Sequence, residues 1–402
     1  MRPFALALCL AVACAAPQSR PAVDSSAASN AESNAASNAA SIAASNAGSN
    51  AAEPDLRARY SQDPALWPAP TLSVGVEHRE LGLLAVPVRD ASPAARAKED
   101  LGQLLFFDAR LSGTGQMACA SCHDAELGFG DGRATSFGHG GLALARNAPS
   151  LWNTGLRTSW FWDGRASSLE DQAALVIGNA QEMHGSVESA VATVASSRGY
   201  RARFAEAYGD EQVTAERLLG ALAAFERTLI SDRSSAFDRF LSGERDALGD
   251  AELRGLHLFR TKARCLNCHS GPLLTDERFH NLGLTYYGRE LEDLGRYRVT
   301  KDPADVGAFR TPSLRNLGRT GPYMHNGLFE LEGVINMYSA GMPRIEPSEA
   351  QKDDPLFPRK SPLVERLDLD AQEKGDLAAF LRSLTERKRR IRAPELPSLG
   401  DA

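Results

Sequence analysis

Cys119-Ala-Ser-Cys122-His123 and Cys265-Leu-Asn-Cys268-His269 are two copies of one motif in a chain of 402 residues. In each copy two residues separate a pair of thiols, and an imidazole follows the second thiol directly. This is the spacing at which a c-type haem is attached, because both thiols add to the haem vinyl groups and the His ligates the iron as its proximal ligand. A zinc site would need further Cys or His near each pair, and a redox dithiol would leave the His unexplained. We therefore expect two covalently bound c haems.

The segments that precede the two motifs are also similar to each other. Residues 97–107 and 251–259 both place Leu and Phe at helical spacing, and each leads through a loop into a motif. This indicates the duplication of one module, which consists of a helix, a loop and a haem-attachment site.

Two further helices are expected outside the repeated module. The first covers 215–230, and the second covers 371–384, where Asp370 and Glu373 can form a capping box. The apolar face of the first consists of Leu218, Leu219, Leu222, Phe225 and Leu229. Alternating strand patterns are scarce. We therefore expect a mostly α fold, with two cytochrome c-like haem domains that have long loops and pack around an interface between them.

The N-terminal residues have the pattern of an export signal. Arg2 precedes a short apolar run that ends at Val12 and is too short to span a bilayer. Leu10-Ala-Val-Ala-Cys14 resembles the bacterial lipobox, in which the Cys becomes lipidated, while the small residues around Cys14 also fit ordinary cleavage. We expect a signal peptide at 1–14, of the lipoprotein type rather than the soluble type. The protein would then be periplasmic or in the cell envelope, where a lipid at Cys14 could anchor it to a membrane.

Residues 15–60 are expected to be a flexible linker. Ser-Asn-Ala-Ala-like tetrads fill most of this segment, and a period of four small residues offers no apolar face to bury. The N-terminal haem domain is expected at 61–240 and the C-terminal haem domain at 241–392.

The net charge and the number of cysteines limit which binding partners and which covalent modifications are expected. The net charge of −6 argues against nucleic acid as the main partner. Of the six Cys, Cys9 leaves with the signal and Cys14 is the candidate lipid site, so the remaining four are those of the two motifs. No Cys is left for a disulfide, although an exported chain would normally form them.

Six further segments carry a family resemblance. They are Leu-Phe-Phe-Asp-Ala-Arg-Leu-Ser-Gly at 105–113, Gly-Phe-Gly-Asp-Gly at 128–132, Arg-Asn-Ala-Pro-Ser-Leu at 146–151, Phe-Trp-Asp-Gly-Arg-Ala at 161–166, Phe-Arg-Thr-Pro-Ser-Leu-Arg-Asn at 309–316 and Gly-Pro-Tyr-Met-His-Asn-Gly at 321–327. In this order, and nearly without gaps, they resemble the bacterial di-haem cytochrome c peroxidases. They are also similar to the related di-haem enzymes that mature tryptophan-derived quinone cofactors.

The resemblance implies that hydrogen peroxide binds at the N-terminal haem, with His123 as the proximal ligand. It also implies that Glu182 is the acid–base carboxylate and Gln172 its distal amide partner. A carboxylate suits this chemistry because cleavage of the O–O bond moves a proton from one oxygen to the other, which one Glu can do. Burial beside a haem would raise the pKa of this Glu and help it exchange protons near neutral pH. The alternative is that Glu182 is a surface residue of a polar helix.

His139 is the residue that distinguishes the branches of the family. In peroxidases that need activation, a His at this place caps the N-terminal iron in the resting enzyme and leaves when the other haem is reduced. The tryptophan-oxidising relatives do not depend on it. Glycines on both sides of His139 would let its loop move. The alternative is an exposed loop His.

The resemblance implies a six-coordinate C-terminal haem with His269 as the proximal ligand and either Met342 or Tyr338 as the distal one. Met would raise the reduction potential and suit a haem that takes in electrons, whereas Tyr would favour ferric iron. We favour Met342. Trp162 matches the tryptophan between the haems, where its π system would pass electrons, and simple core packing is the alternative.

A calcium site between the haems is also implied. Asn147, Thr320 and Pro322 match its ligands, which are a side-chain amide and two backbone carbonyls, and oxygen ligands suit this hard cation. Asn147 and Thr320 could instead be turn residues. Arg310 and His325 lie in the same family segments and are expected to have supporting roles.

Three functions agree with the sequence. The first is an exported di-haem peroxidase, possible as a homodimer, that reduces hydrogen peroxide to water with electrons from a small cytochrome c or a cupredoxin; the electrons would enter at the C-terminal haem and pass through Trp162. The second is a di-haem oxidase that modifies Trp or Tyr of a partner protein, and Tyr338 as an axial ligand motivates it. The third is a non-catalytic electron carrier or peroxide sensor, which requires that both irons stay six-coordinate.

Overall fold

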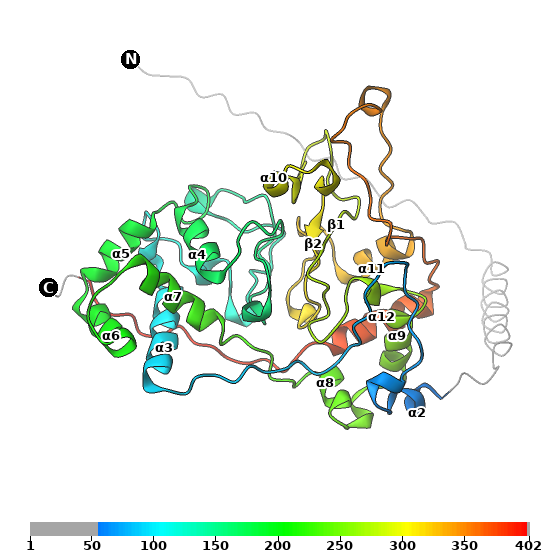
Figure 1. The fold of residues 1–402 in the computed structure, drawn as a ribbon, viewed down its shortest axis with the longest axis horizontal. Coiled ribbons are helices and arrows are strands. Elements are labelled where there is room, and N and C mark those ends of the chain that lie inside the picture. Colours follow the sequence, from blue (N-terminus) through cyan, green and yellow to red (C-terminus); the bar gives the residue numbers. More distant parts are fainter. Residues whose placement is uncertain (1–54, 400–402) are drawn as a thin grey trace, which may run out of the picture. The chain divides into compact units, whose positions relative to one another are not determined.

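Helices make up most of the regular structure in the computed structural model, which describes residues 55–399 (Figure 1). This confirms the mostly α class. The helices are α2 (Leu56–Tyr60), α3 (Pro93–Phe107), α4 (Leu169–Gly178), α5 (Val187–Ala195), α6 (Arg198–Tyr208), α7 (Ala215–Glu226), α8 (Ala236–Leu241), α9 (Asp250–Arg260), α10 (Tyr297–Thr300), α11 (Leu331–Ser339) and α12 (Ala371–Ser383). The strands β1 (Phe279–His280) and β2 (Phe309–Arg310) form one short antiparallel pair.

The expected duplication appears as two similar pairs of packed helices. In the first half α3 packs against α7, and in the second half α9 packs against α12. A glycine allows each close approach: a Cβ on Gly102 would lie 1.9 Å from the Ala221 carbonyl oxygen, and a Cβ on Gly255 would lie 2.0 Å from that of Asp376. The helices that precede the two motifs, α3 and α9, therefore make the same kind of close contact with α7 and α12.

The predicted helix ends differ from the observed ones in one informative place. The helix expected over 215–230 ends at Glu226, because the Leu229 carbonyl accepts a hydrogen bond from Asn153 at 2.7 Å and the chain leaves the helix axis. The capping box of Asp370 and Glu373 at the start of α12 is confirmed.

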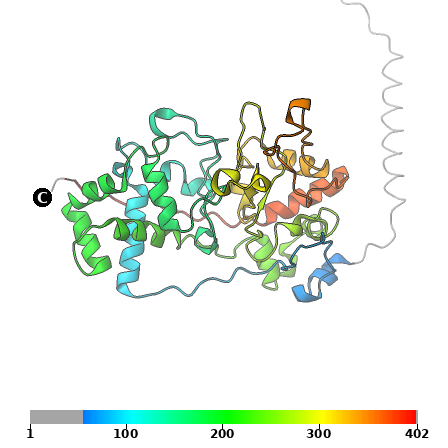
Figure 2. The same ribbon diagram turned by 45° about the horizontal axis from the view of Figure 1, so that its top comes forward.

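Each half has its own apolar core, and the ends of the described chain are exchanged between the two cores. Tyr60 and Leu81 precede α3 but are buried in the core of the second half. Ile391 follows α12 but packs against the core of the first half. Two segments therefore cross between the halves (Figures 1 and 2). The domain predicted at 61–240 thus contains a segment of the other core, and the domain predicted at 241–392 ends against the first core.

The signal peptide predicted at 1–14, including Cys14, and most of the linker predicted at 15–60 lie outside the described residues. The described end of that predicted linker is not a flexible coil, because Leu56–Tyr60 forms α2 and Tyr60 is buried in the second core. Among residues 55–399, no helix has both the length and the apolar composition that a membrane crossing requires.

Candidate functional site

Both cysteine motifs adopt the same tight turn. Single 3-10 turns form at Cys119–Ser121 and Cys265–Asn267, after α3 and α9 respectively. In each turn the backbone N–H of the motif His donates to the carbonyl of the first Cys, at 3.0 Å for His123 and 2.8 Å for His269. All four Cys of the described chain are free thiols. Each turn therefore offers the thiols and the imidazole that haem attachment needs.

One nitrogen of each motif imidazole is held by a backbone carbonyl. Nδ1 of His123 lies 2.9 Å from the Phe129 oxygen, and Nδ1 of His269 lies 3.1 Å from the Leu274 oxygen. A carbonyl can only accept, so Nδ1 carries the proton and the lone pair is left on Nε2. Burial lowers the pKa of both imidazoles and favours this neutral form, which is the form that binds iron.

A cavity of about 910 Å³ lies beside the first motif. Cys119, Cys122 and His123 form part of its wall. The wall also contains predicted site residues from separate segments of the chain, namely Asn147, Trp162, Gln172 and Glu182. The structure therefore brings these residues together around the first motif.

Glu182 is placed at this wall by the turn that follows α4. Its N–H donates to the Asn179 carbonyl at 3.1 Å. Its Oε2 is buried and has no hydrogen-bond partner within residues 55–399. Burial raises the pKa of the carboxyl, and the positive charge of Arg165 offsets part of that shift. Glu182 thus has the properties of a proton carrier with one oxygen left for a ligand.

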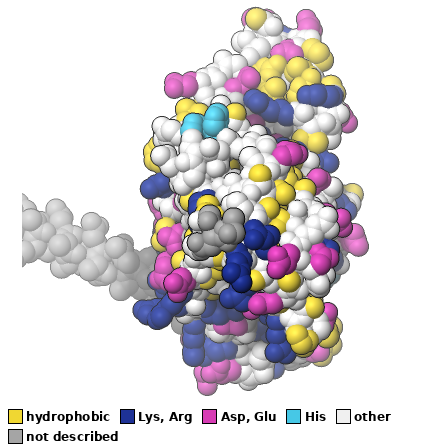
Figure 3. Space-filling model, turned by 90° about the vertical axis from the view of Figure 1, so that its left-hand side faces the viewer, with side chains coloured by type: hydrophobic (Ala, Val, Ile, Leu, Met, Phe, Trp, Pro, Cys, Tyr) yellow, Lys and Arg dark blue, Asp and Glu magenta, His cyan; other side chains and the backbone are white. Residues whose placement is uncertain are grey.

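His139 lies apart from the other predicted residues. Its ring is not on the cavity wall but stacks on His184, with ring centroids 4.1 Å apart and planes 7° from parallel. Histidine side chains are visible at the surface in the view of Figure 3. The His139 N–H lies 3.0 Å from the carbonyls of both Gln181 and Glu182. Its role as an iron ligand of the resting enzyme stays a prediction.

Two arginines on the cavity wall indicate what kind of group the cavity holds. Arg157 and Arg310 share one nearby carboxylate, Glu277, which lies 3.5 Å from Arg310. Burial, together with the charge of Arg157, lowers the pKa of Arg310 to about 9. The buried Arg310 and the half-buried Arg157, with one counter-ion between them, favour a further anion. The propionates of a haem are such anions, so this lining, with the thiols and His123, fits a haem.

Trp162 connects the cavity to the second half of the chain. Its indole N–H donates to the Asn147 carbonyl at 2.9 Å, and its own carbonyl accepts from the Arg310 N–H in β2 at 2.8 Å. Its ring is edge-on to His325, with centroids 6.5 Å apart, and His325 stacks on Phe309 at 3.6 Å. Burial lowers the pKa of His325 to about 4, which keeps it neutral. Trp162 therefore begins a row of aromatic rings that leads to β2.

The two candidate distal ligands of the second haem both lie near the end of α11. Met342 is 6% exposed and has a left-handed backbone with φ of +59°. Burial raises the pKa of the Tyr338 phenol far above its usual range, and Cys268 and Cys265 raise it further. Tyr338 is half-buried in α11, and the charges of both motif thiols act on its phenol.

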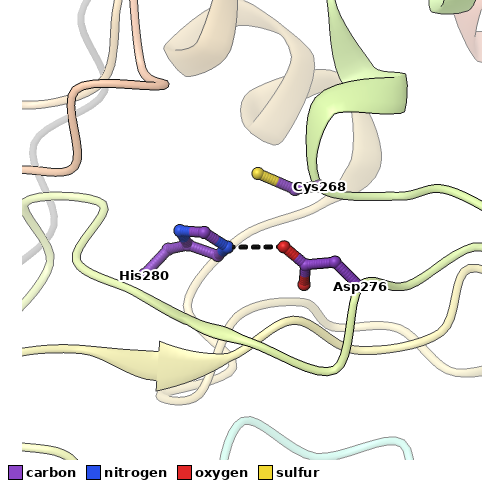
Figure 4. A group of neighbouring side chains, drawn as sticks. All are labelled: Cys268, Asp276 and His280. Carbon is purple, nitrogen blue, oxygen red and sulfur yellow. Dashed lines mark hydrogen bonds and ion pairs between the residues drawn. The ribbon is translucent and has the colours of Figure 1, made fainter. Parts of the chain in front are cut away.

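Cys268 also lies beside an ion pair formed by Asp276 and His280 (Figure 4). Nε2 of His280 is 2.8 Å from Oδ2 of Asp276. Burial opposes the charged imidazole, but the contacts with Asp276 and Cys268 outweigh it and raise the pKa of His280 to about 10. A metal ion would need the Cys268 sulfur, which haem attachment uses. We therefore interpret the cluster as an ion pair next to the second haem.

The predicted calcium ligands are only partly gathered. Asn147 lies on the cavity wall, and its amide nitrogen donates to the Arg133 carbonyl at 2.9 Å, which leaves Oδ1 as the ligand atom. Thr320 donates to the Leu317 carbonyl at 3.3 Å, and the peptide bond before Pro322 is cis. The calcium site stays a prediction.

Glu226 is a residue of this site that sequence reasoning missed. It lines the cavity, is 5% exposed and leaves Oε2 without a hydrogen-bond partner in the described part of the chain. A signal for it existed: position 226 is four residues after Leu222 and three before Leu229, so it falls on the apolar face of the predicted helix. An acidic residue on such a face is unusual.

A family model described as di-haem cytochrome c peroxidase matches residues 96–246. The methylamine utilization protein MauG of Methylophilus methylotrophus is 37% identical over 78% of this chain and 90% of its own. The cytochrome c551 peroxidase of Nitrosomonas europaea is 38% identical over 64% of this chain and 78% of its own.

A solved structure extends the similarity to the fold. The crystal structure of a MauG-like protein associated with microbial copper homeostasis has a TM-score of 0.65 and 33% identity, and the match covers 84% of this chain and 95% of that one.

Proposed function

This chain belongs to the di-haem cytochrome c peroxidase family, and we propose that it reduces hydrogen peroxide to water with electrons from a small cytochrome c or a cupredoxin. The observation that carries the proposal is the cavity beside the first motif, on whose wall His123, Gln172 and Glu182 meet. Membership of the family implies two c haems, and both motifs have the geometry that holds them.

The chain's own residues would act as follows. When bound, the haem in the cavity supplies the iron site for peroxide and the electrons for its reduction. His123 would hold that iron through Nε2, which the Phe129 carbonyl leaves free by binding Nδ1, and Arg157 and Arg310 would offer positive charge to the haem propionates. Glu182 takes a proton from one peroxide oxygen and returns it to the other, while the Gln172 amide orients the peroxide by hydrogen bonding.

The second motif would serve electron entry. His269 holds the second iron, and Trp162 with His325 and Phe309 forms the aromatic route between the two halves. The test is steady-state peroxide consumption with a reduced small cytochrome as donor. Rapid turnover supports the proposal, and the absence of turnover with every cytochrome and cupredoxin tried contradicts it.

Several finer features belong to the proposal. We infer export by residues 1–14 with a lipid at Cys14, which mass analysis of the mature N-terminus would detect. Calcium at Asn147, Thr320 and Pro322 would be detected by metal analysis before and after chelation. A homodimer would be seen by light scattering.

A second candidate is a di-haem oxidase that modifies Trp or Tyr of a partner protein. Tyr338 as the distal ligand of the second haem favours it, because a phenolate ligand stabilises high oxidation states of iron. The similarity to MauG proteins agrees with it. A partner protein whose mass changes on addition of peroxide would support this candidate. Fast turnover of small donors with no such partner would exclude it.

The distal ligand of the second haem gives a spectral prediction. We propose Tyr338 as this ligand rather than Met342, which the sequence favoured, because the charges of both motif thiols act on its phenol. We expect Tyr338→Phe to alter the visible and spin-resonance spectra of the ferric second haem, and Met342→Ala to leave them unchanged. A methionine–sulfur band in the oxidised wild type that Met342→Ala removes would contradict this assignment.

A further inference from the structure

Glu226 is a buried carboxyl for which the proposed peroxidase mechanism has no role. It is the last residue of α7 and lines the cavity together with Cys119, on a different segment from Glu182. It is 5% exposed, and its Oε2 lacks a hydrogen-bond partner among residues 55–399. Burial without a hydrogen-bond partner is unfavourable for a carboxyl. A role in function would explain why Glu226 occupies this position.

Two charged groups act on Glu226, one from its own segment and one from α4. Arg227 follows it in the chain, but its guanidinium is bound to Glu170 of α4 at 2.8 and 3.0 Å. Glu170 adds a negative charge, and Cys119 lies close in the first motif turn. The other helices that pack on α7, which are α3 and α5, contribute no charged group that acts on Glu226 in the described chain. Burial is the largest influence and raises the pKa of Glu226 to about 8.

We propose that Glu226 couples proton uptake to electron uptake in this cavity: its carboxylate takes up one proton when the haem bound there gains one electron, and it releases that proton on re-oxidation. The electron comes from the one-electron donor protein and the proton from solvent. The bond that forms is the O–H bond of the Glu226 carboxyl, and re-oxidation breaks it. The inference rests on the proposed function only in requiring a haem in this cavity.

The physical reason is the change of charge in a dry cavity. One added electron makes the haem more negative, and charges in a cavity of low polarity are weakly screened from each other. The pKa of Glu226 is therefore higher beside a reduced haem than beside an oxidised one. Between these two values, reduction takes up a proton, so the reduction potential falls as pH rises. Since reduction of one peroxide to two waters consumes two protons and two electrons, a proton delivered with an electron serves the reaction.

The test is a spectroelectrochemical titration of both haems in the intact holoenzyme at a series of pH values from 5.5 to 9.5, which bracket the pKa of about 8. In the wild type we expect the potential of the first haem to fall with pH across part of this range. In Glu226→Gln that slope is expected to disappear, while the potential of the second haem keeps its wild-type pH dependence. Glu386→Gln is the matched control, because Glu386 is also buried with a raised pKa but does not line this cavity.

Three outcomes would overturn the proposal: an unchanged slope in Glu226→Gln, a slope lost in Glu182→Gln instead, or no slope in the wild type. If Glu226→Gln does not incorporate haem, the wild type and Glu226→Asp still test the proposal by infrared spectroscopy. The reduced-minus-oxidised infrared spectrum of the wild type must show a protonated carboxyl that forms on reduction, and this band must shift in Glu226→Asp. A missing or unshifted band counts against the proposal. Peroxide turnover is measured in a separate experiment. The pH dependence of the potential therefore tests the role of Glu226 even if the protein is not a peroxidase.

Discussion

Replacing Glu182 by Gln is expected to lower kcat/KM for hydrogen peroxide about 100- to 10,000-fold, which is the usual contribution of a positioned general acid–base. Gln keeps the shape of the side chain but cannot accept and return a proton. The buried Oε2 of Glu182 has no partner in the described residues, so the substitution breaks no hydrogen bond of that atom. Haem content and folding should therefore be unchanged. Stopped-flow or steady-state peroxide consumption with a reduced cytochrome measures the effect.

Glu188→Gln provides the matched control for this experiment. Glu188 lies in the first turn of the neighbouring helix α5 and is exposed, so its substitution removes the same charge without touching the cavity. We expect wild-type turnover in this variant. Full activity in Glu182→Gln would contradict the assigned role.

Removing the first haem-attachment site is expected to abolish both peroxide turnover and the stable fold of the first half. In Cys119→Ala/Cys122→Ala the haem is no longer held covalently, and the cavity of about 910 Å³ loses its filling. The apolar part of the lining, which includes Leu151, Ala173 and Ile177 of the first core, would then be exposed to water. We therefore expect collapse or unfolding of the first half, measured as rapid proteolysis between α3 and α7 and a lost thermal transition.

The reciprocal variant, Cys265→Ala/Cys268→Ala, separates the roles of the two haems. This variant should lose peroxide turnover with the donor protein, because electrons no longer enter at the second haem. If it folds, it should keep the spectrum of the first haem. If the Cys119→Ala/Cys122→Ala protein lacks the first haem but resists protease as well as the wild type does, the first haem is not needed to stabilise the first core.

Local features of the fold could be predicted from the sequence because each depends on neighbouring residues. Leu and Phe spacing located the motif-bearing helices, and Asp370 with Glu373 marked the start of α12, where the capping box is observed. The end of α7 was placed too late, because a carbonyl contact with Asn153, distant in sequence, ends that helix. The exchange of chain ends between the cores was also missed, since an isolated apolar residue such as Leu81 does not reveal which core it joins.

In the candidate site too, residues marked by a sequence pattern were predicted, and residues placed by distant contacts were not. The Cys-x-x-Cys-His spacing alone indicated haem, and the family segments led to Gln172 and Glu182, which the structure places on one cavity wall. Glu226 was not predicted, although its position on the apolar face of the predicted helix is visible, because the sequence does not show that this position borders a cavity. The stacking of His139 on His184 could not be predicted, because no pattern links two side chains in separate loops.

We propose that the two haems are unequal, with the first open to peroxide and the second closed. Optical and spin-resonance spectra of the fully oxidised and half-reduced enzyme, recorded before and after addition of peroxide, test it most directly. We expect half-reduced enzyme to contain one high-spin, five-coordinate haem whose spectrum changes first when peroxide is added, and we expect Glu182→Gln to slow this change. Two haems that stay low-spin and six-coordinate in every state, with no response to peroxide, would contradict it and favour an electron carrier.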